Sequence, residues 1–71
     1  MGFPEFLAEI EALCVKLRDD LKRGSDRGRV LRRARQGLAM LDNAQVHDEG
    51  DVILHEIARE DLLDIIRQAG G

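Results

Sequence analysis

Few side chains in this sequence could do chemistry, and the most suggestive are two histidines. His47 and His55 lie eight residues apart, with Asp48, Glu49 and Asp51 between them. Imidazole and carboxylate groups bind zinc, so this segment could contribute to a metal site. However, the spacing matches neither two ligands at i and i+4 on a helix nor a Cys/His ligand pattern. A zinc site at His47 and His55 is therefore a minor alternative, and we expect no bound metal.

Nucleophilic side chains are equally scarce. Ser25 is the only serine, the chain has no threonine, and Cys14 is the only cysteine. Ser25 stands where a residue that caps a helix is expected. Cys14 falls within an apolar stripe without a neighbouring histidine that could activate its thiol, so we expect it in the core. No glycine-rich nucleotide-binding pattern occurs. We therefore expect no catalytic residues, no cofactor and no enzymatic activity.

Positive charge is concentrated in one part of the chain. Residues 16–35 contain nine Lys and Arg against three Asp, whereas residues 36–71 contain eight acidic residues against two arginines. Like charges three and four residues apart on a helix destabilise it by a few tenths of a kcal/mol per pair, so a negative group should lie nearby. The candidate charged binding residues are Arg29, Arg32, Arg33 and Arg35.

Three sources of negative charge could pair with these arginines. The first is internal, because Glu56, Glu60 and Asp64 recur every four residues along one flank of the last predicted helix. The second is an acidic partner protein. The third is nucleic acid, whose phosphates an arginine-rich helix could contact. The net charge of −3 and the lack of Trp and Tyr disfavour nucleic acid.

The elements that carry these residues follow from the apolar spacing. Apolar side chains three and four residues apart place one narrow stripe on each of three helices, and such stripes pack against other helices. The stripes consist of Leu7, Ile10, Cys14, Leu17 and Leu21; of Leu31, Ala34, Leu38 and Leu41; and of Ala58, Leu62, Ile65 and Ala69. The sequence therefore predicts an all-α fold.

Local signals set the expected helix ends at about 4–23, 26–42 and 51–68, all within one small domain over residues 1–71. Pro4 suits a first helical turn, and Gly24 suits a helix end. Ser25 or Asp26 can cap the second helix, Asp51 can cap the third, and Gly70–Gly71 end it. The short connection at Gly24 predicts an antiparallel hairpin of the first two helices, with the third packed beside it.

One segment allows two interpretations. Val52, Ile53 and Leu54 form a run with high β-propensity, so residues 45–57 could form a β-hairpin ahead of a shorter last helix. The alternative is a loop followed by a helix. Continuous apolar spacing from Leu54 through Ala58 to Leu62 favours the helix.

Several apolar residues lie outside the stripes. A three-helix monomer of this size has little interior in which to cover them, so they are candidates for binding another protein or a second copy. They are Phe3, Phe6, Leu13, Met40, Leu63 and Ile66, with Ile53 as a further surplus residue. A homo-oligomer, such as a helical dimer, would cover them.

Composition bounds the setting and the function. One cysteine allows no internal disulfide, the start of the chain lacks a signal-peptide pattern, and no apolar run reaches the ~18–20 residues that span a bilayer. We expect a cytoplasmic protein without a membrane segment. The expected function is a non-enzymatic helical module for protein–protein interaction, with a regulatory, adaptor, chaperone or inhibitor role. The alternative is a nucleic-acid-associated regulator, such as an antitoxin or a small transcription factor, that uses the arginine-rich helix.

Overall fold

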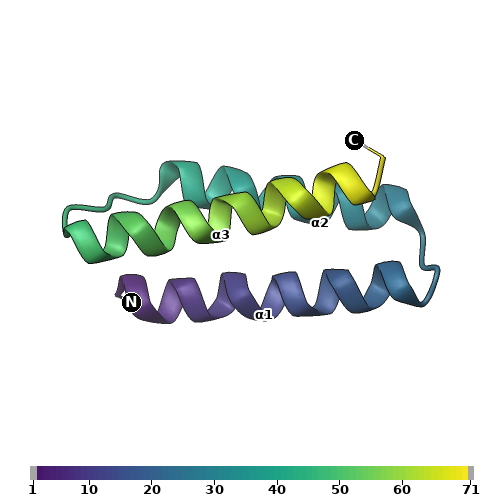
Figure 1. Ribbon diagram of the computed structural model, residues 1–71, viewed down its shortest axis with the longest axis horizontal. Coiled ribbons are helices and arrows are strands. Elements are labelled where there is room, and N and C mark those ends of the chain that lie inside the picture. Colours follow the sequence, from purple (N-terminus) through teal and green to yellow (C-terminus); the bar gives the residue numbers. More distant parts are fainter. Residues whose placement is uncertain (1, 71) are drawn as a thin grey trace.

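The polypeptide forms three α-helices joined by two short loops. The computed structural model describes residues 2–70 and contains α1 (Phe3–Lys22), α2 (Arg27–Asn43) and α3 (Glu49–Gln68). Successive helices run in opposite directions along a bundle of 37 × 19 × 15 Å (Figure 1). The all-α class and the three-helix arrangement are confirmed. Within the described residues, no helix combines the length and the apolar character needed to cross a bilayer.

A Schellman motif ends α1 and turns the chain back toward α2. The backbone N–H of Ser25 donates to the carbonyl oxygen of Asp20 at 3.0 Å, and that of Gly24 donates to Leu21 at 3.2 Å. Gly24 has a φ of +76°, a left-handed conformation that costs glycine little. The predicted glycine stop is confirmed.

Aspartates cap the other two helices. The side chain of Asp26 accepts a hydrogen bond from the N–H of Gly28 at 2.9 Å, and that of Asp48 accepts one from Gly50 at 2.8 Å. The prediction that Asp51 caps the third helix is wrong, because Asp48 already satisfies a free N–H at an earlier position. Acidic residues in the first turn of α3 also interact favourably with the helix dipole.

Residues 45–57, for which the sequence allowed either a β-hairpin or a loop and a helix, form a loop followed by a helix. Residues 44–48 form the loop, residues 49–57 lie in α3, and no strand occurs in residues 2–70, so the β-hairpin alternative is wrong. The cap at Asp48 explains the outcome, since it commits the following residues to helical geometry. At its other end, α3 stops before Gly70, whose φ is +90°. Gly71 lies outside the described residues.

The core is a single aliphatic cluster to which all three helices contribute. The predicted stripe of α3 is fully buried, and that of α1 is buried except for Leu21, which is half-buried. The buried apolar residues are Leu7, Ile10, Cys14, Leu17, Val30, Ala34, Leu41, Ala58, Leu62, Ile65 and Ala69.

The inward face of α2 differs from the predicted one. Val30 and Gly37 are buried, whereas Leu31 and Leu38, which the spacing assigned to the stripe, are half-buried at its edge. Gly37 explains the rotation. A Cβ at this position would lie 3.0 Å from a methyl of Leu13 and 3.5 Å from methyls of Leu62, so the missing side chain lets both neighbouring helices approach.

We predict that Leu17→Ala lowers the free energy of unfolding by about 2–4 kcal/mol, because the side chain of Leu17 is fully buried and its loss leaves a cavity. The measurement is urea denaturation followed by circular dichroism. Val15→Ala on the outer side of α1 is the control and should cost under about 0.5 kcal/mol. Equal small losses at both positions would show that the assignment of the core is wrong.

Candidate interaction surfaces

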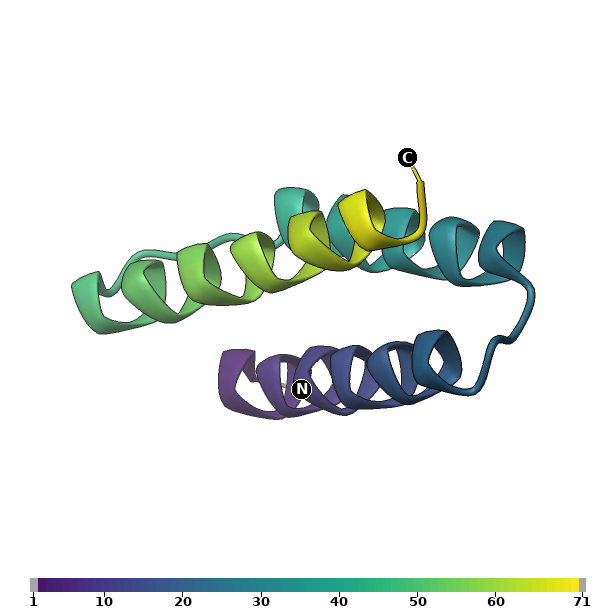
Figure 2. The ribbon, with the colours of Figure 1, turned by 45° about the vertical axis from the view of Figure 1, so that its right-hand side comes forward.

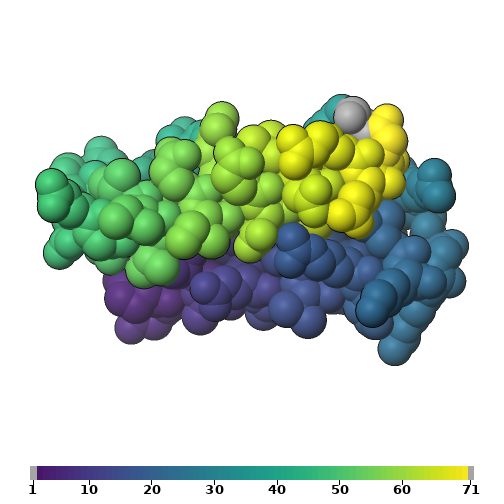
Figure 3. Space-filling view, in the orientation of Figure 1, coloured from purple at the N-terminus to yellow at the C-terminus, as the bar shows by residue number. Residues whose placement is uncertain are grey.

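The N-terminal end of α3 projects beyond the other two helices. Its first turn extends past the start of α1, and its first two turns extend past the end of α2, in both ribbon views (Figures 1 and 2). The space-filling view shows the same overhang, with this end of α3 at the left of the molecule (Figure 3). The projecting turns therefore have fewer helical neighbours than the rest of α3.

Four aliphatic side chains are exposed near this end of α3, within the segment Val52–Ile57. Val52 is 44% exposed, Ile53 61%, Leu54 42% and Ile57 54%. We call these four residues the apolar tip. Three consecutive residues of a helix point in directions about 100° apart, so neighbours on one side cannot cover all of them. The spacing from Leu54 through Ala58 to Leu62 correctly predicted a helix here, but Leu54 itself is exposed.

A histidine holds this end of α3 to the rest of the bundle. The Nε2 atom of His55 lies 2.7 Å from the carbonyl oxygen of Leu41, in the last turn of α2. Since a carbonyl oxygen only accepts, Nε2 carries the hydrogen. The imidazole also stacks on Phe3 of α1, with ring centroids 6.5 Å apart. His55 thus joins the start of α3 to both other helices, and His47 is exposed in the loop.

The structure does not assemble the alternative metal site. His55 is directed at Leu41, and no three His, Cys, Asp or Glu side chains gather around a common point within residues 2–70. Cys14 is buried in the core as the spacing predicts. Burial raises the pKa of its thiol, the carboxylate of Asp61 raises it further, and Arg18 opposes them. The thiol therefore stays protonated and weakly reactive.

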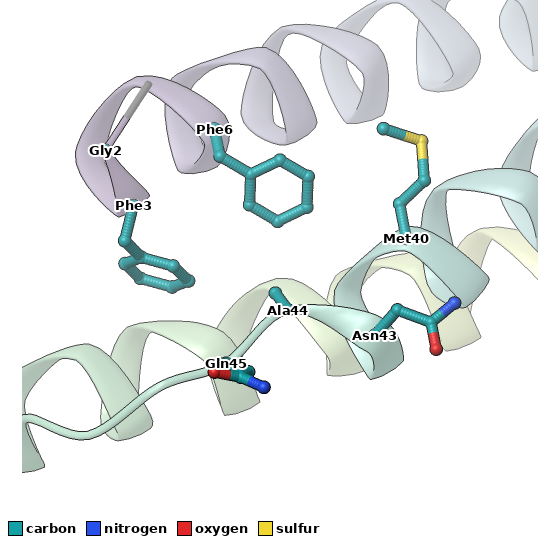
Figure 4. Close-up of a pocket in the computed structure, with 7 residues that line it drawn as sticks. All are labelled: Gly2, Phe3, Phe6, Met40, Asn43, Ala44 and Gln45. Atoms are coloured by element: carbon teal, nitrogen blue, oxygen red, sulfur yellow. The ribbon is translucent and has the colours of Figure 1, made fainter.

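Three of the predicted apolar binding residues meet in a groove. Phe3 and Phe6 project from α1 toward the chain around Ala44, and Met40 projects from α2 toward α1 (Figure 4). The groove has a volume of about 510 Å³. Met40 is exposed, whereas the two phenylalanines are half-buried and pack on the core.

The other three predicted apolar residues are not part of this groove. Leu13 lies against Gly37 at the contact between α1 and α2. Leu63 and Ile66 are half-buried on α3, and Ile66 packs on the core. The predicted set therefore divides into three residues of one groove and three half-buried residues elsewhere.

The arginines of α2 do not form the predicted ion pairs with carboxylates of α3. Arg29, Arg32 and Arg35 are exposed and Arg33 is half-buried, and within residues 2–70 no ion pair involves any of them.

The ion pairs between helices show why the internal pairing fails. Arg18 of α1 lies 3.2 Å from Asp61 and 3.9 Å from Asp64, so this flank of α3 faces α1. The flank that faces α2 carries Arg59, which pairs with Asp42 at 3.3 Å. The prediction that Glu56, Glu60 and Asp64 pair with the arginines of α2 is therefore wrong.

Comparisons with known proteins were made by sequence and by structure. No protein-family model, curated protein or solved structure matches this chain.

We predict that His55→Ala lowers the free energy of unfolding by about 1 kcal/mol, because it removes the hydrogen bond to Leu41 and the stacking on Phe3. Amide hydrogen exchange in residues 49–57 should also become faster. His47→Ala in the exposed loop is the matched control and should change stability by under about 0.5 kcal/mol. Identical behaviour of the two variants would contradict the role assigned to His55.

Proposed function

We propose that this chain is a non-enzymatic interaction module that binds another protein, or a second copy of itself, through the apolar tip of α3. The observation that carries the proposal is the concentration of four exposed aliphatic side chains within Val52–Ile57. Single exposed apolar side chains are ordinary on a protein surface, whereas a cluster of them is typical of a binding site. An adaptor, chaperone or inhibitor works through such a surface, and the proposed role is regulatory.

Charge segregation gives this module a preferred orientation. Basic side chains lie on α2 and the end of α1, whereas residues 36–71 carry a net charge of −6 from eight acidic residues and two arginines. Complementary potentials accelerate the encounter of two proteins and suppress wrong orientations. A partner would therefore meet the two sides of the bundle differently.

We predict that the folded protein enhances the fluorescence of Nile red, an uncharged dye, and that Ile53→Ser with Ile57→Ser removes most of the enhancement. Both side chains are more than half exposed, so their replacement removes apolar surface without opening a cavity. Val15→Ser is the control, because Val15 is 69% exposed on α1, away from the tip.

Urea denaturation of each variant shows whether it is still folded. Light scattering over a range of concentrations shows whether the tip is covered by a second copy. A folded monomer that does not bind the dye would contradict the proposed function.

A second candidate function is nucleic-acid binding through α2. The observation in its favour is the absence of ion pairs at Arg29, Arg32, Arg33 and Arg35 within residues 2–70. Arg32 and Arg35 also border a shallow hollow on α2, together with Leu31. Exposed guanidinium groups along one helix suit contacts with phosphate groups.

This candidate predicts binding to duplex DNA that weakens steeply with salt. In a plot of the logarithm of the association constant against the logarithm of the salt concentration, the magnitude of the slope should fall by about 1 for each contacting arginine replaced. It should therefore fall by about 2 in Arg29→Ala with Arg32→Ala. Both residues are exposed, so the fold should persist. Arg67→Ala on α3 is the control. If the duplex does not bind at low salt, or if the slope is the same in the double variant, nucleic acid is excluded.

A further inference from the structure

Negative charge surrounds the apolar tip. Residues 48–57 include four carboxylates and no Lys or Arg, and Glu60 follows one turn later. Glu49, Glu56 and Glu60 are exposed. Within residues 2–70, no ion pair involves these three. A ligand that covers the tip therefore meets both exposed apolar side chains and uncompensated carboxylates.

This charge discriminates between possible occupants. A second copy docked tip to tip would bring the same carboxylates together, and like charges across an interface cost several kcal/mol. An anionic membrane surface would be repelled for the same reason. A positively charged partner would instead gain from the surrounding carboxylates.

The geometry of α3 indicates where a partner could lie. Asp61 and Asp64 mark the flank of α3 that faces α1, because Arg18 pairs with both. Leu54 and Ile57 precede Asp61 by seven and four residues and therefore lie on the same flank. Although α1 begins beside His55, Leu54 is 42% exposed and Ile57 54%, so this flank remains open to a partner.

We propose that the apolar tip docks a basic amphipathic helix of a partner protein, which lies along the exposed flank of α3 beside the start of α1. This inference rests on the proposed function and specifies its partner. The apolar stripe of the partner helix covers Leu54, Ile57 and Ile53, since amphipathic helices bind with their apolar face against exposed apolar side chains. Its Lys and Arg side chains lie beside Glu56 and Glu60, which select it over neutral or acidic helices.

The experiment uses two labelled peptides of ~18 residues, or about five helical turns. Both carry Leu at positions three and four apart, and the remaining positions are mainly Lys in one peptide and Glu in the other. Fluorescence anisotropy at ~0.15 M salt measures binding to the full chain, since exposed charges are partly screened there. The Lys peptide should bind and the Glu peptide should not.

Variants separate the apolar contribution from the charge. Ile53→Ser with Ile57→Ser should weaken binding of the Lys peptide by at least about tenfold, given the apolar surface that is lost. Glu56→Gln with Glu60→Gln should weaken it by about threefold to tenfold and flatten its salt dependence. Val15→Ser should have no effect.

Five results would overturn the proposal. Equal binding of both peptides, or failure of both while Nile red still reports the apolar tip, would reject a basic partner and leave the proposed function standing. Binding of the Lys peptide that is insensitive to the isoleucine substitutions would show attraction by charge alone. Self-association that is lost in Arg29→Ala with Arg32→Ala would identify a second copy as the occupant. If neither peptide nor Nile red binds the folded protein, the proposed function itself is rejected.

Discussion

The bundle depends on burying one narrow aliphatic stripe from each of three short helices. Because Phe3 and Phe6 are the only aromatic residues, no large side chain fills the interior, and the helices must come close to one another. Gly37 permits this approach, since it presents only backbone to Leu13 and Leu62. The glycine costs about 1 kcal/mol of helix propensity relative to alanine, and the packing of its neighbours offsets this cost. The positions of the helix flanks, and hence of every exposed group, follow from this packing.

Much of the fold could be predicted from local signals. The stop at Gly24 and the buried stripes of α1 and α3 depend on residues close in sequence, and the structure confirms them. The rotation of α2 could not be predicted, because the advantage of Gly37 exists only where α1 and α3 meet it. The start of α3 was misplaced by two residues because Asp48 and Asp51 both satisfy the preferences of a capping residue.

The candidate surfaces were less predictable than the core. In the sequence, the run Val52–Leu54 indicated β-propensity and only Ile53 was assigned to the surplus apolar residues, because the exposure of this run depends on where the neighbouring helices lie relative to α3. The charge pattern was visible as well, whereas the partners of each charge were not. The flank of α3 that faces α2 carries Arg59 in place of an acidic row, so the arginines of α2 and the carboxylates of the tip both face outward. Positive and negative charges that are separated along the sequence therefore also lie on different surfaces of the bundle.

The hydrogen bond from His55 has a consequence for the entropy of association. A helix end without neighbours tends to fray, and a partner that binds a frayed segment must first order it, which reduces the affinity. His55 lies between Leu54 and Ile57, and its contacts with Leu41 and Phe3 keep these turns helical in the free protein. The apolar tip is thus organised before any partner arrives, so that little of the interaction energy of its few side chains is spent on folding the site.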